Sequence, residues 1–79
     1  MNTEKRAELN FKMRKIMFWL YNSRVWCMKN ADIINQYGWM VKNSNVDILL
    51  LSDFVNKLST MKIERQQEIR RQHTTYHII

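Results

Sequence analysis

Apolar positions recur every three or four residues in three segments of the 79-residue chain, which is the pattern of amphipathic helices. The first segment begins near Thr3, whose hydroxyl can cap a helix, and predicts a helix over residues 3–29. Its expected core stripe is Leu9, Met13, Ile16, Leu20 and Cys27. Two further apolar stripes follow the same helix, one of Phe11, Phe18 and Val25 and one of Trp19 and Trp26. The first helix therefore carries more apolar circumference than one neighbour can cover.

Two short polar segments separate the remaining helices of the chain. Asn30-Ala31-Asp32 indicates a new helix start, and a second helix is expected over 31–42. Gly38 within it costs about 1 kcal/mol relative to alanine, unless it permits close packing or marks a bend. Asn43-Ser44-Asn45 is a turn, and Ser44 followed by Asp47 resembles a capping box for a third helix over 45–71. The tail, 72–79, is rich in β-branched residues and is expected to be weakly ordered.

These elements predict an all-α fold, a small three-helix domain with a long N-terminal helix and a partly disordered C-terminal tail. The absence of proline and the single glycine agree with helices joined by short connections. We expect the first and third helices to form the main antiparallel pair. The core is expected to contain Leu9, Ile16, Leu20, Leu51, Phe54 and Leu58. The excess apolar surface of the first helix predicts a homodimer or a tight complex.

Charge adds a preference for an acidic partner. Thirteen Lys and Arg against seven Asp and Glu give a net charge of +6. Residues 1–29 hold seven basic residues against Glu4 and Glu8, whereas residues 30–62 are balanced. Such an excess favours a nucleic acid, RNA or DNA, or an acidic protein surface, although charge can also serve solubility alone.

Several classes of function find little support in the residues. There is no glycine-rich phosphate loop and no nucleophile beside a base, so we expect no enzyme and no cofactor. His73 and His77 lack a third ligand nearby in sequence and make a poor metal site. Gly38 does not fit the turn of a helix-turn-helix motif, because Ile34 stands where a small residue is needed. The apolar run 16–21 is too short for a signal peptide or a membrane span, and Cys27 is alone, so a cytoplasmic protein is predicted.

The most suggestive group of residues lies on the first helix, where basic side chains surround two tryptophans. Lysines pair with phosphate or carboxylate, and indoles stack on bases or anchor protein interfaces. The alternatives are that the tryptophans pack within the domain or against a second copy, or that the helix lies on a membrane surface. The candidate binding residues are Lys5, Lys12, Lys15, Trp19, Asn22, Trp26 and Lys29, followed by Arg65, Arg70 and Arg71 in the third helix.

The sequence thus predicts a small, basic, non-enzymatic binding protein. Its short length, its many Asn and Met residues and its lack of proline are typical of accessory proteins of phages and mobile elements. We expect a stoichiometric inhibitor or regulator of a host protein or ribonucleoprotein that handles nucleic acid. The alternative is a regulator that binds RNA or DNA directly through the basic and aromatic side of the first helix.

Overall fold

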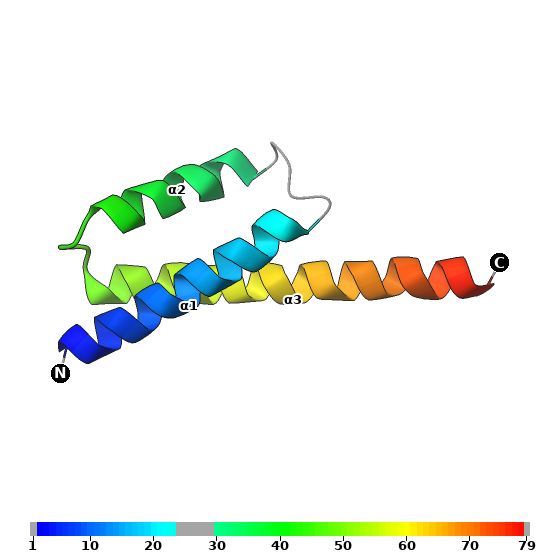
Figure 1. The fold of residues 1–79 in the computed structure, drawn as a ribbon, viewed down its shortest axis with the longest axis horizontal. Helices are drawn as coiled ribbons and strands as arrows, with labels where there is room; N and C mark the ends of the chain where they lie inside the picture. Colours follow the sequence, from blue (N-terminus) through cyan, green and yellow to red (C-terminus); the bar gives the residue numbers. More distant parts are fainter. Residues whose placement is uncertain (1, 24–29, 79) are drawn as a thin grey trace.

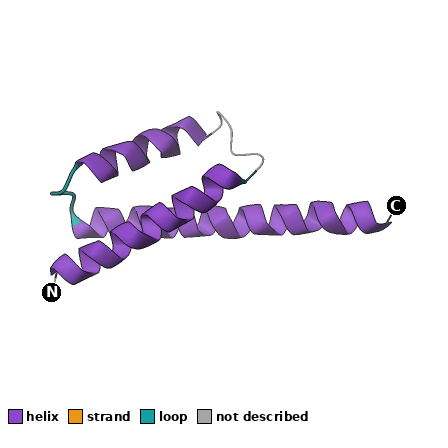
Figure 2. Ribbon diagram, viewed as in Figure 1, coloured by secondary structure: helices purple, strands orange, loops and turns teal. Residues whose placement is uncertain are grey.

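Three α-helices account for nearly all of the structure, a computed structural model that describes residues 2–23 and 30–78, with side chains from Thr3 to Ser23 and from Asn30 to Gln72. They are α1 (Asn2–Asn22), α2 (Ala31–Lys42) and α3 (Ile48–Ile78), and no strand occurs among the described residues (Figure 2). The predicted all-α class is confirmed, and the predicted bounds of the second helix are those of α2.

The first helix ends earlier than the apolar pattern predicts. Nδ2 of Asn22 donates to the carbonyl oxygen of Phe18 at 2.9 Å, and both the backbone N–H and the hydroxyl of Ser23 donate to Leu20. Asn and Ser side chains that bond to nearby backbone groups compete with the helical hydrogen bonds, and here they close the last turn. α1 therefore ends at Asn22, where a helix over 3–29 was expected; residues 24–29, with the predicted positions Trp26 and Lys29, lie outside the described residues.

The third helix is shifted toward the C-terminus relative to the expected 45–71. It begins at Ile48 because Asp47 is its cap: Oδ1 of Asp47 accepts a hydrogen bond from the backbone N–H of Leu49 at 3.1 Å. Ser44 lies in the preceding turn, so the expected capping role of Ser44 belongs to Asp47. The helix ends at Ile78, seven residues beyond the predicted end. Disorder of the tail stays a prediction.

α1 and α3 run in the same direction, with α2 antiparallel to both (Figure 1). Arg6, near the start of α1, donates to the carbonyl oxygen of Val46 just before α3, and Trp19, near the end of α1, contacts Lys62 farther along α3. The antiparallel pairing expected for the first and third helices is therefore wrong. The chain reverses direction at each of two connections, so the first and third helices must be parallel.

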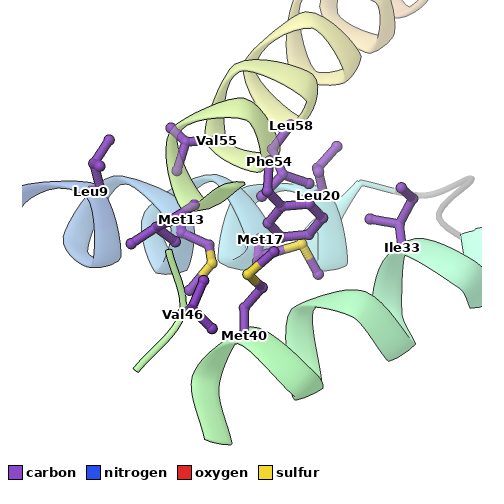
Figure 3. Close-up of a cluster of buried hydrophobic side chains, with 11 residues drawn as sticks. Leu9, Met13, Met17, Leu20, Ile33, Met40, Val46, Phe54, Val55 and Leu58 are labelled. Carbon is purple, nitrogen blue, oxygen red and sulfur yellow. The ribbon is translucent and has the colours of Figure 1, made fainter. Parts of the chain in front are cut away.

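The core lies between α1 and α3 and is closed by α2. Met13 and Met17 of α1 are almost completely buried, as are Leu51 and Leu58 of α3. Met40 of α2 points toward Met17 and Phe54 (Figure 3). The expected core residues Leu9, Leu20, Leu51, Phe54 and Leu58 are buried, whereas Ile16 is partly buried against them.

The molecule is elongated because α3 is longer than α1 and α2 and extends beyond them. The radius of gyration is 14.8 Å and the extents are 52 × 25 × 16 Å, against a radius of roughly 12 Å for a globular chain of this length. Among the described side chains, the last buried one on α3 is Leu58. The segment from Lys62 to Ile78, which we call the arm, continues as helix past the end of α1 (Figure 1).

Candidate functional site

Three of the candidate residues lie on one line of α1. Lys5, Lys12 and Trp19 are seven residues apart, and seven residues are nearly two helical turns, so their side chains share one side of the helix. Lys5 and Lys12 are exposed, and Nζ of Lys12 lies 3.8 Å from Oε1 of Glu8. This ion pair between two exposed side chains adds little to stability and leaves the ammonium group accessible.

Trp19 is part of the packing between α1 and α3. Its side chain is partly buried against the core, and Nζ of Lys62 lies 5.5 Å from the centroid of its ring. An ammonium group over an indole face makes a cation–π interaction. One face of the ring is thus taken by α3, which agrees with the packing alternative for Trp19 and leaves less of the indole for stacking on a base.

The contact between Trp19 and Lys62 joins the basic side of α1 to the arm. Lys62, Gln66 and Arg70 are four residues apart and form one ridge of α3. Because α1 and α3 are parallel, this ridge continues where the line of Lys5, Lys12 and Trp19 ends. We call Lys5, Lys12, Lys62 and Arg70 the basic track.

Arg65, another candidate residue of α3, is not part of the basic track because its side chain is largely buried. Its side chain is only 11% exposed, and Nη1 lies 3.0 Å from Oε2 of Glu68. Neither Nη1 nor Nε makes a hydrogen bond of normal geometry, so the contact with Glu68 acts as an ion pair. Arg71, which follows Arg70 by about 100° around the helix, is exposed and points away from the ridge. Arg70 and Arg71 each make further interactions.

The side of α1 opposite the core forms a second exposed surface, which the sequence alone does not indicate as a site. Phe11 and Phe18 are 65% and 71% exposed, on the side of α1 opposite the buried Leu9, Met13 and Leu20. Lys15 belongs to this surface, because its Nζ lies 5.4 Å from the centroid of the Phe11 ring. The spacing of seven between the two phenylalanines, half a turn from the core stripe, was the signal that could have found it. We call Ala7, Glu8, Phe11, Lys15 and Phe18 the outer face of α1.

The remaining candidates have local or undescribed surroundings. The side chain of Asn22 closes the last turn of α1. In the part of the chain that the structure describes, no group of three His, Cys, Asp or Glu side chains could hold a metal ion. The side chains of His73 and His77 fall outside that part. None of the described helices is both long and apolar enough to cross a bilayer.

Comparison with known proteins gives no relative. The chain matches no protein-family model, no curated protein and no solved structure.

Proposed function

We propose that the protein is a non-enzymatic regulator that binds an acidic surface of a partner protein through the basic track. The observation that carries this proposal is the contact of Lys62 with Trp19, which brings the lysines of α1 into line with the basic residues of the arm. A row of basic side chains along two parallel helices presents an elongated positive surface. Such a surface accelerates encounter with an acidic partner and sets its orientation.

An acidic residue beside the track favours a protein over a nucleic acid. Glu8 pairs with Lys12 of the track, whereas Glu68 pairs with Arg65 on the side of α3 away from Arg70. The Glu8 carboxylate beside Lys12 would repel a phosphate backbone, whereas a protein surface can supply a basic group to match it. The partial burial of Trp19 also removes one platform on which an unpaired base could stack.

The target that we favour is a host protein that handles nucleic acid, and the action that we favour is stoichiometric inhibition or regulation. This choice rests on the short, basic, proline-free sequence, which is typical of accessory proteins of phages and mobile elements. A surface of ammonium and guanidinium groups along two helices supports action by occupation of a partner's surface.

Direct binding of RNA or DNA is the alternative, and one observation favours it. The arm extends past the rest of the fold and carries Lys62 and Arg70 on one ridge, so it can reach a groove or loop that the core cannot. A nucleic-acid complex of this kind would weaken steeply with salt, because each neutralised phosphate releases counterions.

The test is affinity purification from the native host, with and without nuclease, using the natural chain and Lys5→Glu/Lys12→Glu. The expected result is one protein retained after nuclease treatment by the natural chain and lost, by at least tenfold, with the variant. The free energy of unfolding should change by no more than about 1 kcal/mol, because both lysines are exposed.

Lys57→Glu is a single-site control, since Lys57 is exposed on α3 away from the ridge of Lys62. It changes the net charge in the same sense at a different place and should retain the partner. Retention that disappears with nuclease would favour the nucleic-acid alternative. Equal retention by all three proteins would rule out the basic track.

A further inference from the structure

The outer face of α1 is the most exposed apolar surface of the helix and has no cover among the described residues. Phe11 and Phe18 leave 65% and 71% of their surface in water, although the same helix buries Met13 and Met17 almost completely on its opposite side. Large apolar groups gathered on one face indicate an interaction site, because removal of their exposed surface from water favours association.

The charges on this face have a definite order along the helix. Glu8 lies toward the N-terminus and Lys15 toward the C-terminus, seven residues apart and on the same flank of the two phenylalanines. At the edges of the face, Glu4 lies on this same flank and Arg14 lies on the opposite flank. The face therefore has as many acids as bases, and it complements neither a uniformly acidic nor a uniformly basic partner.

The same order is self-complementary when two copies meet in opposite directions. In an antiparallel pair with the two Phe11 rings at the twofold axis, equal flanks face each other, and Glu8 of each copy lies near the level of Lys15 of the other. In a parallel pair, by contrast, opposite flanks would meet, so that Lys15 of each copy would lie beside Arg14 of the other. Two basic side chains so close together would destabilise a parallel dimer. The antiparallel pair also brings the small Ala7 within one helical turn of Phe18 of the second copy, which leaves room for the large ring.

We propose that the outer face of α1 binds a second copy of this chain as an antiparallel twofold dimer centred on Phe11. The proposal goes beyond the regulator function and does not depend on it. The ion pair of Glu8 with Lys12 does not prevent the pairing, because at 3.8 Å and with both side chains exposed it is readily exchanged. Lys5 and Lys12 lie beyond the flank of the contact and stay accessible, so each dimer carries two basic tracks with arms pointing in opposite directions.

One pair of helices forms a contact at the small end of specific interfaces, so dissociation constants in the micromolar range are expected. Sedimentation equilibrium from about 1 to 500 μM, an interval set by that expectation, measures the association of the natural chain. Glu8→Lys and Lys15→Glu should each weaken the dimer at least tenfold, since each creates two like-charge pairs across the twofold axis. Phe11→Ala should weaken it to the same extent or more, because it removes the centre of the contact.

A mixture of the two charge-reversed variants distinguishes the antiparallel dimer from other arrangements, because only this dimer should regain its affinity in the mixture. In an equimolar mixture of the two single variants, both basic groups of the Glu8→Lys chain face both acidic groups of the Lys15→Glu chain. A heterodimer near the natural affinity should therefore form. The double variant Glu8→Lys/Lys15→Glu should likewise form a homodimer, because the exchange of the two charges keeps each cross-pair opposite in sign. Lys57→Glu, outside the face, should leave association unchanged, and circular dichroism checks that every variant is folded.

A natural chain that remains monomeric to the highest concentration would overturn the proposal. So would a dimer that the single charge reversals do not weaken, or a mixture that stays monomeric although each variant is folded.

Discussion

Nζ of Lys62, on α3, lies 5.5 Å from the centroid of the Trp19 ring, near the end of α1. This contact fixes the parallel alignment of the two helices at the end opposite to the hydrogen bond from Arg6 to Val46. Trp19 therefore has a structural role that its place among lysines in the sequence does not reveal. Lys5, Lys12 and Lys15, on the same helix, remain exposed.

The structural role of Trp19 predicts a loss of stability on its removal. Trp19→Ala should lower the free energy of unfolding by about 2 to 3 kcal/mol, below the value for a fully buried tryptophan because the ring is only partly buried. Lys62→Met, which keeps the aliphatic stem and removes the charge, should cost about 0.5–1 kcal/mol. Urea denaturation followed by circular dichroism measures both changes. Unchanged stability of Trp19→Ala would make the indole a contact residue instead.

Gly38 is a position where the natural residue weakens its helix. A Cβ atom added there would meet no atom within 4 Å beyond its two neighbours and the backbone of its own helix, and the backbone has no positive φ, so alanine fits without strain. The close packing considered for this glycine from the sequence is therefore absent. Gly38→Ala should raise the free energy of unfolding by up to about 1 kcal/mol, because alanine has the higher helix propensity. A thermal melt that shows destabilisation would mean that α2 bends at Gly38 in solution.

Asp47 should contribute to stability as the cap of α3. Its Oδ1 accepts the N–H of Leu49, and its own carbonyl accepts the N–H of Leu51 at 3.0 Å. Asp47→Ala should cost about 1 kcal/mol, whereas Asp47→Asn should cost a few tenths, since asparagine caps nearly as well. Asp53→Ala is the control, because Asp53 is an exposed position inside the same helix. Equal losses at positions 47 and 53 would assign the effect to charge rather than to capping.

The sequence predicts the helices better than their relation to one another. α2 matches because polar residues flank it on both sides, and Asn43 closes it with a backbone N–H bond to Trp39. The end of α1 is missed because the apolar period continues past it, while the bonds of Asn22 and Ser23 to the backbone leave no trace in periodicity. Side-chain periodicity also carries no direction, so it cannot distinguish a parallel from an antiparallel pair.

For the candidate site, periodicity predicts which side chains are exposed but not how α1 packs on α3. Lys5 and Lys12 are exposed as expected, because lysines away from a core stripe stay in water. The sequence places Trp19 on their exposed side, but packed helices cross at an angle, so the side of α1 that meets α3 changes along its length. The outer face was visible in the sequence as the pair Phe11 and Phe18, although only packing could show that nothing in the described chain covers it.

In the free protein, the backbone amides of the arm should be less protected from hydrogen exchange than those of the other helical segments. No described side chain beyond Leu58 is buried, and an isolated helix of this length is marginal when no apolar face is packed. Backbone amides near Leu51 and Leu58 should therefore exchange with solvent slowly, and those from Gln66 to Ile78 faster by orders of magnitude. Residue-resolved hydrogen exchange measures the difference. Addition of the partner that binds the basic track should slow exchange around Arg70, since binding orders the helix. Protection that is uniform from Leu51 to Ile78 in the free, monomeric protein would contradict this prediction, because helix propensity alone would then hold the arm.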